Sequence, residues 1–184
     1  AFKAAQSRKG KLTLVDKANA LASSRLWRKV VKELATQYPD VELNFMYIDN
    51  AARELIINPR QFDVILTENM FGDILSEEAS VIVGSIGLLA SSSINDKHAM
   101  FEPIHGANGK LTNKGVANPI ASILSAAMLL DHFGLDKEAA LVRKAVNKSL
   151  KLRITTPDLN MKYDNISTTK VGDFIEDFIN NPEE

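Results

Sequence analysis

The sequence predicts an α/β protein in which strands and helices alternate around a parallel or mixed sheet. Short runs with strand character, such as residues 12–15 and 64–66, are followed by longer segments with helical periodicity. Hydrophobic residues make up 45% of the chain and charged residues 24%, which is the ordinary balance of a globular protein. A length of 184 residues suits one compact domain or two small lobes.

The elements of the first part of the chain follow from apolar periodicity and from helix start and stop signals. Residues 1–8 are expected to end a helix that closes near Gly10, and Ser24 is expected to cap the helix that ends before Pro39. The elements expected next are a strand over 41–48, a helix over 51–57, a strand over 64–66 and a helix over 71–83.

The run Gly84-Ser85-Ile86-Gly87 interrupts this pattern and indicates a hinge between two lobes, residues 1–83 and 84–184. An extended segment over 98–104 and a Gly- and Asn-rich loop over 106–118 come next. Three helices complete the chain, with Pro119 in the first position of one, Asp136 capping the second, and Thr168 or Thr169 capping the third.

Composition excludes several classes of protein. Lys and Arg total 22 and Asp and Glu total 23, so the basic excess of a nucleic-acid-binding protein is missing. The absence of cysteine excludes disulfides and thiolate catalysis and fits the cytoplasm. No apolar run approaches the ~20 residues of a membrane span. We therefore expect no nucleic-acid partner and no membrane partner. The chain starts without Met, which suggests that it is part of a longer protein.

Asp73 and Glu77 lie four residues apart in an expected helix, which places both carboxylates on one face. All-oxygen ligands of this kind select Mg²⁺ or Mn²⁺. The spacing alone is more typical of two solvated surface acids. The position of Asp73 just after an expected buried strand favours a metal ligand, because ligands bind at the carboxyl ends of strands in open α/β sheets.

Two further residues follow expected strands. Asp49 either caps a helix or supplies a third oxygen to the metal. Lys17 is either solvated or, near a metal, a residue that transfers protons.

The loop that begins at His105-Gly106 and ends at Asn118-Pro119 could cradle a dinucleotide with backbone groups and a helix N-terminus. The Gly-x-Gly-x-x-Gly fingerprint is absent, and His105 considered alone is a structural histidine.

Several runs in this order resemble the 3-isopropylmalate dehydrogenases. They are Val15-Asp16-Lys17-Ala18-Asn19-Ala20-Leu21, Ser24-Arg25-Leu26-Trp27, Tyr47-Ile48-Asp49-Asn50-Ala51-Ala52, the segment 62–76 around Asn69-Met70-Phe71-Gly72-Asp73, Glu102-Pro103-Ile104-His105-Gly106 and Gly115-Val116-Ala117-Asn118-Pro119. Asp16 before Lys17 favours this branch over the isocitrate and homoisocitrate dehydrogenases, which usually have His there. The match covers nearly the whole chain but only the C-terminal half of a family member. The segments that supply the substrate-binding arginines and the catalytic tyrosine have no counterpart here.

The resemblance implies a two-lobed fold, with the later part of the substrate and dimerisation lobe at 1–83 and the returning part of the cofactor lobe at 84–184. It implies NAD-linked, Mg²⁺- or Mn²⁺-dependent oxidative decarboxylation of 3-isopropylmalate in leucine biosynthesis by a homodimer with shared active sites. The roles it implies are catalysis for Lys17, metal binding for Asp49, Asp73 and Glu77, and cofactor binding for His105, Gly106, Asn118 and the loop residue Lys110. Lys17, with a relay through Asp49, would take the substrate hydroxyl proton, and both would act in the partner subunit's site.

Two positions depart from the family pattern. Glu77 stands where the family has Asp, and Lys110 stands where the family has an Asp that accepts hydrogen bonds from the adenosine ribose. Lys110 either meets a 2′-phosphate or points to solvent, so the preference between NAD and NADP stays open. Two alternatives also stay open: a non-catalytic dimerisation or cofactor-lobe fragment, and a sibling enzyme acting on tartrate, malate or homoisocitrate. Because the substrate arginines and the tyrosine are missing, we expect no turnover by the chain alone.

Overall fold

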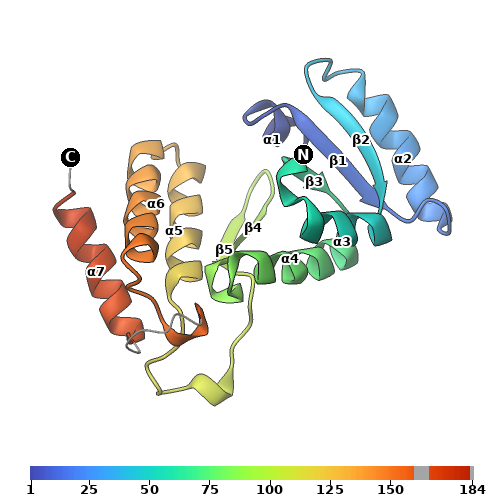
Figure 1. The fold of residues 1–184 in the computed structure, drawn as a ribbon. Coiled ribbons are helices and arrows are strands. Elements are labelled where there is room, and N and C mark those ends of the chain that lie inside the picture. Colours follow the sequence, from blue (N-terminus) through green and yellow to red (C-terminus); the bar gives the residue numbers. More distant parts are fainter. Residues whose placement is uncertain (160–165, 183–184) are drawn as a thin grey trace. The chain divides into compact units, whose positions relative to one another are not determined.

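The computed structural model describes residues 1–159 and 166–182, and the chain divides into two compact units, residues 1–82 and 83–184 (Figure 1). The elements that begin in the first unit are α1 (Phe2–Gln6), β1 (Lys11–Asp16), α2 (Ala22–Ala35), β2 (Glu42–Tyr47), α3 (Ile48–Ile57), β3 (Val64–Leu66) and α4 (Asn69–Val83). Each unit has its own hydrophobic core.

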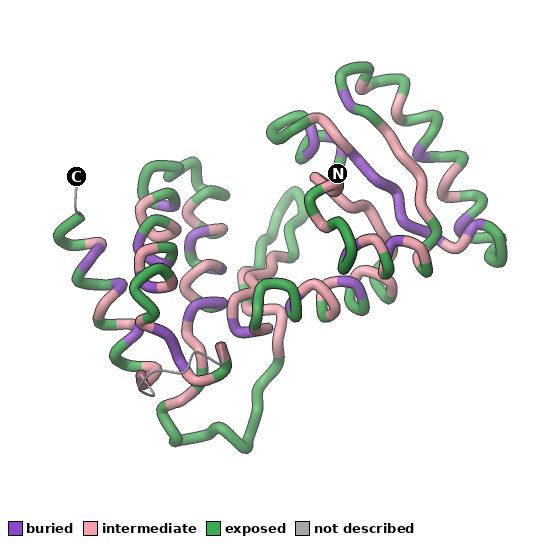
Figure 2. Tube along the Cα trace, in the orientation of Figure 1, coloured by how far each residue is buried: buried purple, intermediate pink, exposed green. Residues whose placement is uncertain are grey.

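The first unit is built on a parallel sheet of three strands in the order β2-β1-β3. The central strand β1 is buried along almost its whole length, as Figure 2 shows. Leu12 and Leu14 pack into one core cluster with residues of α1 and α2, whereas Val15 packs into another with residues of α3 and α4. Because successive side chains of a strand point to opposite faces, helices cover both faces of this sheet.

The parallel pairing brings the carboxyl ends of the strands to one edge of the sheet. Asp16 at the end of β1 pairs with Tyr47 at the end of β2, and Leu14 pairs with Leu66 at the end of β3. The residues that follow these strands therefore gather at the edge where open α/β sheets bind ligands.

The second unit combines an antiparallel hairpin with three helices. Its main elements are β4 (Ala90–Ile94), β5 (Ala99–Pro103), α5 (Ile120–His132), α6 (Asp136–Lys151) and α7 (Thr168–Asn180). Its core centres on Ile120 of α5, Val146 of α6 and Ile175 of α7. Along the part of the chain that the structure describes, no helix has both the length and the apolar character needed to span a bilayer.

The predicted α/β class is confirmed, although the strands form two sheets, one parallel and one antiparallel. The predicted alternation holds in the first unit and is wrong in the second, where a hairpin is followed by helices α5, α6 and α7 with no strand between them among the described residues. β4 was not predicted, because its sequence Ala-Ser-Ser-Ser-Ile lacks the apolar alternation of a typical strand.

Three predicted helix caps are wrong. Ser24 lies inside α2, whose N-cap is Leu21, and its hydroxyl accepts a hydrogen bond from the Lys17 N–H instead. Asp136 lies in the first turn of α6, after the N-cap Leu135. Ser167 caps α7, where its hydroxyl accepts from the N–H of Lys170 at 3.2 Å. Ser and Asp side chains hydrogen-bond several nearby backbone groups, so composition alone leaves the capping position uncertain by a few residues.

Candidate functional site

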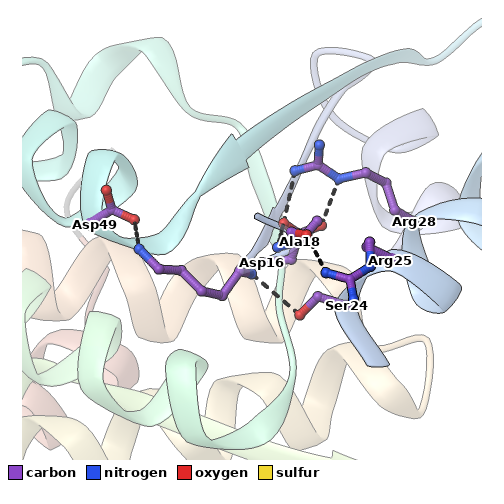
Figure 3. Close-up of polar contacts among 7 residues, drawn as sticks. Asp16, Ala18, Ser24, Arg25, Arg28 and Asp49 are labelled. Atoms are coloured by element: carbon purple, nitrogen blue, oxygen red, sulfur yellow. Dashed lines mark hydrogen bonds and ion pairs between the residues drawn. The ribbon is translucent and has the colours of Figure 1, made fainter. Parts of the chain in front are cut away.

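Lys17 and Asp49 form a close ion pair at the carboxyl edge of the parallel sheet (Figure 3). Lys17 directly follows β1, and Asp49 is the second residue of α3, which starts where β2 ends. The pairing of Asp16 with Tyr47 places these positions side by side. The Lys17 Nζ donates to Asp49 Oδ1, so the structure brings together the two residues predicted to be catalytic.

This ion pair favours the ionised form of Asp49. The hydrogen bond from Lys17, with a smaller contribution from the Asp49 backbone N–H, holds the pKa of Asp49 below its usual range. The Lys17 side chain is 28% exposed and the Asp49 side chain 64% exposed, so both remain within reach of a ligand from solvent.

The backbone at Lys17 is held by side chains from the first turns of α2. The Lys17 N–H donates to Ser24 Oγ at 3.3 Å, and Arg25 Nη1 donates to the carbonyl oxygen of Ala18 at 3.1 Å (Figure 3). The Lys17 carbonyl oxygen accepts from the N–H groups of residues 20 and 21. These contacts fix the point from which the Lys17 side chain extends.

A buried ion pair lies next to Lys17. The fully buried Asp16 carboxylate accepts from Arg28 Nε and Nη2 at 2.8 Å each, and from the Ala18 N–H at 3.0 Å. The hydrogen bond to Asp16 raises the pKa of Arg28. The guanidinium also lies 5.1 Å from the ring centroids of Phe45 and Tyr47. Arg28 was not predicted as a site residue, although its spacing of four residues from Ser24 places both on one face of α2.

Asp73 and Glu77 are both exposed on α4, one helical turn apart. Neither carboxylate is hydrogen-bonded to Asp49. Within residues 1–159 and 166–182, no group of three or more His, Cys, Asp or Glu side chains is placed to hold a metal ion. The donor set of α4 still suits a hard divalent cation, because two carboxylates on one helix face supply oxygen ligands of the right chemistry. In a single chain, Asp73 and Glu77 thus lie together on α4, and Asp49 does not join them in one group of ligands.

The second unit contains a cleft of about 480 Å³. It is lined by residues 85–87, 105–108, 111–112 and 116–118, together with Asp158. Three of the predicted cofactor residues, His105, Gly106 and Asn118, therefore line one cavity. The fourth, Lys110, lies in a short 3₁₀ turn (Gly109–Leu111) between lining residues and is exposed.

Asp158 is hydrogen-bonded to several of the segments around this cleft. Its Oδ2 accepts from Ser85 Oγ and from Asn118 Nδ2, the latter at 3.0 Å, and its Oδ1 accepts from Thr156 Oγ1 at 2.6 Å. The Asn118 Oδ1 in turn accepts from the Ile120 N–H at 3.0 Å, at the start of α5. Asp158 was not predicted as a site residue, because two of its partners lie 40 and 73 residues away in the sequence.

Gly87 approaches Asn118 so closely that only glycine fits. A Cβ at position 87 would lie 2.7 Å from the Asn118 Cβ and 3.2 Å from its Nδ2. The backbone at residues 85–87 and the Asn118 amide therefore form one wall of the cleft.

Comparison with known proteins places these features in one family. The family model for isocitrate/isopropylmalate dehydrogenase matches residues 1–175. The 3-isopropylmalate dehydrogenase of Carboxydothermus hydrogenoformans is 56% identical over 160 residues, which cover 86% of this chain and 42% of that protein. The 3-isopropylmalate dehydrogenase of Bacillus subtilis is 52% identical over 177 residues, which cover 95% of this chain and 48% of that protein.

Solved structures of dehydrogenases from this family have a similar fold. A β-decarboxylating dehydrogenase from Thermococcus kodakarensis superposes with a TM-score of 0.87 at 40% identity, covering 98% of this chain and 52% of that one. An isocitrate dehydrogenase from Methylococcus capsulatus superposes with a TM-score of 0.88 at 37% identity, covering 92% and 50%. The chain spans about half the length of the relatives it matches. By the extent and identity of these matches, the chain belongs to the isocitrate/isopropylmalate dehydrogenase family.

Proposed function

We propose that this chain is the C-terminal half of a 3-isopropylmalate dehydrogenase, an enzyme of leucine biosynthesis in the cytoplasm. The whole enzyme would carry out NAD-linked, Mg²⁺- or Mn²⁺-dependent oxidative decarboxylation. One observation carries the proposal: a Lys17–Asp49 pair stands at the carboxyl edge of the sheet in a chain about half identical to named 3-isopropylmalate dehydrogenases.

The two parts of the chain would serve different purposes. Residues 1–83 would belong to the substrate and dimerisation lobe, since they contain Lys17, Asp49, Asp73 and Glu77. Residues 84–184 would belong to the cofactor lobe, since they contain the cleft lined by His105, Gly106 and Asn118.

When bound, the divalent metal would supply a Lewis acid for the substrate hydroxyl, and the nicotinamide cofactor would supply the acceptor for a hydride. Because Lys17 stands as an ammonium in its ion pair with Asp49, it would first pass a proton through Asp49 to solvent, and its neutral amine would then accept the proton released at that hydroxyl. Asp49, to which Lys17 donates, fixes the position of the amine and stabilises the ammonium form that results. Ser24 holds the Lys17 N–H and Arg25 holds the carbonyl oxygen of Ala18, so that the Lys17 side chain needs little reorganisation to act.

Asp73 and Glu77 would hold the metal from α4, and Asp49 of a second copy would complete the oxygen set. This arrangement requires a homodimer with shared sites. An apolar surface on α3 and α4 supports such an interface, because large aliphatic side chains there are exposed. They are Ile56, Ile57, Met70, Ile74 and Val81, which are between 55% and 80% exposed.

Metal binding can be tested on the 184-residue chain without turnover. Mn²⁺ titration, followed by paramagnetic broadening of backbone amide signals, should broaden signals around residue 73. Asp73→Asn should abolish this effect, whereas Asp173→Asn, an equally exposed acid on α7, should leave it unchanged. Equal broadening in the Asp73→Asn variant would contradict the proposed metal site.

Sedimentation of the same chain tests the interface. We expect dimers, and we expect Val81→Glu to yield monomers, because a charge in an apolar interface is left without a partner. We also expect no steady NADH production from 3-isopropylmalate, Mn²⁺ and NAD by the chain alone. Sustained turnover would show that the missing half is not needed.

A further inference from the structure

Four cationic side chains lie on one face of α2. Arg25, Arg28, Lys29 and Lys32 are spaced at positions i, i+3, i+4 and i+7, so each lies about one helical turn from another. Like charges at this spacing repel one another. α2 also has no acidic residue in its first turn, where the positive end of the helix dipole favours an anion. The fold therefore concentrates positive charge on one short stretch of helix surface.

These four side chains line a cavity of about 590 Å³ in the first unit, together with Ala18, Glu33 and Tyr47. Among the described residues that line it, Glu33 is the one acid. Its Oε1 lies 4.0 Å from the Lys29 Nζ, and both side chains are mostly exposed. An exposed pair of this kind is weak, so Glu33 offsets little of the positive charge around the cavity.

Two of the cations are held in place by aromatic rings of β2. Arg28 donates through Nε and Nη2 to Asp16, and its third guanidinium nitrogen, Nη1, is turned away from Asp16 (Figure 3). The Arg28 Cζ lies 5.1 Å from the ring centroids of Phe45 and Tyr47, and the Lys32 Nζ lies 5.1 Å from that of Phe45. Cations fixed in this way lose little conformational entropy when they bind an anion.

The charges of Arg25 and Lys32 are not neutralised by an acid. Within the part of the chain that the structure describes, neither residue forms an ion pair, whereas Arg28 is offset by Asp16. The Arg25 Nη1 donates to the carbonyl oxygen of Ala18 at 3.1 Å, which leaves its other guanidinium N–H groups available. Two full positive charges thus remain to attract a ligand.

The arrangement favours a small ligand with several negative charges. An α-helix rises about 1.5 Å per residue, so the cations from Arg25 to Lys32 extend over about 10 Å. A single phosphate would reach part of this row, whereas a short chain of phosphates can contact all of it. Guanidinium and ammonium groups bind phosphate oxygens through charge-assisted hydrogen bonds. The net charge of the whole chain is -1, so the cluster is local and unlike the extended basic surface of a nucleic-acid-binding protein.

We propose that this cavity binds a short polyphosphate chain, free or as part of a nucleotide, through Arg25, Arg28, Lys29 and Lys32. The site goes beyond the proposed dehydrogenase function and does not depend on it. It lies next to the catalytic residue in the sequence, because Arg25 is hydrogen-bonded to Ala18, which follows Lys17. A phosphate that binds Arg25 would therefore alter the backbone beside Lys17.

Titration of the 184-residue chain with inorganic tripolyphosphate, in metal-free buffer at low ionic strength, tests the proposal. By calorimetry we expect one ligand per chain. Backbone amide NMR signals of residues 25–32 should shift, and those of Lys17 and Ala18 should shift with them. Orthophosphate should bind about tenfold more weakly or worse, because it contacts fewer cations.

Uridine triphosphate separates the two sources of such a ligand. Affinity equal to that of tripolyphosphate would show that the phosphate chain alone is recognised. Tighter binding, with a shift of the Tyr47 signals, would show that a nucleotide is recognised and that its base contacts the ring at the edge of the cavity.

Two double variants identify the residues responsible. Arg25→Gln with Lys32→Gln should weaken tripolyphosphate binding about tenfold or more, because it removes the two cations without an acidic partner. Lys137→Gln with Lys170→Gln removes two exposed lysines from α6 and α7, and should leave the affinity unchanged. Lys32→Gln alone keeps the hydrogen bond between Arg25 and Ala18, and should weaken binding by less than the double variant does.

Three results would overturn the inference. Failure of tripolyphosphate to bind at millimolar concentration refutes the site. Unchanged affinity in the Arg25→Gln and Lys32→Gln variant refutes the role of the cluster. Equal weakening by the control pair shows only a general attraction between exposed cations and an anion. All three leave the proposed dehydrogenase function standing, since the Mn²⁺ titration tests that function at a different site.

Discussion

Replacing Arg28 with Met should strongly destabilise the first unit, because it leaves the Asp16 carboxylate buried without its cation. Asp16 is fully buried, and Arg28 supplies two of its three hydrogen bonds. Removing one partner of a buried ion pair typically costs ~3–5 kcal/mol. The Arg28 side chain is 22% exposed, and Asp16 keeps the Ala18 N–H, so we expect about 3 kcal/mol, at the lower end.

This loss is large enough to measure directly. For a unit of this size, each 1 kcal/mol shifts the melting temperature by ~4–8 °C, so the variant should melt at least about 12 °C lower. The single tryptophan, Trp27, packs against the first core cluster, so its fluorescence reports unfolding of this unit. Urea unfolding followed by this signal gives the free energy of unfolding of wild type and variant.

A matched control and a double variant separate the buried charge from other effects. Lys29→Met removes an exposed cation from the same helix and should change stability by less than about 0.5 kcal/mol. Asp16→Asn combined with Arg28→Met should be less destabilised than Arg28→Met alone, because no charge is then left buried. If Arg28→Met unfolds within about 0.5 kcal/mol of the Lys29 control, the buried pair does not stabilise the unit as reasoned.

Three further changes have defined outcomes. Lys17→Met should raise the pKa of Asp49 toward its ordinary value, because the hydrogen bond that lowers it is lost; a carboxyl-detected NMR titration that finds no rise would contradict this. Burial disfavours the ionised form of Asp63, but hydrogen bonds from an arginine and two backbone N–H groups outweigh it and lower the pKa. The stability that Asp63 contributes is therefore present above the unfolded pKa of about 3.9 and lost as the pH falls through the lower folded value. Asp63→Asn should be less stable than wild type at pH ~7 and lose less stability in acid, as urea unfolding at the two pH values would show. Gly87→Ala should displace Asn118 and weaken nucleotide binding to the cleft by calorimetry, and unaltered affinity would show that this wall does not position the ligand.

Much of the fold could be predicted because it depends on local periodicity. The strand predicted over 64–66 is β3 itself, and the helix predicted over 71–83 lies within α4. The approach of Lys17 to Asp49 also follows from the order of elements, because each follows a strand and neighbouring parallel strands end at the same edge. The prediction at Ser24 was wrong because local hydrogen bonds compete. Its hydroxyl accepts from the Lys17 N–H instead of capping the end of a helix.

The sequence by itself determined the fold class, the positions of the acidic and basic residues at strand ends, and the glycine-containing loop of the second unit. Only the tertiary structure decided which partners those residues have. Arg28 reaches Asp16 because α2 packs on the face of the sheet beside β1, and Asp158 reaches Ser85 and Asn118 across 73 and 40 residues of chain. Periodicity depends on neighbours a few residues apart, whereas these pairings depend on strand register and on packing between segments that are distant in the sequence.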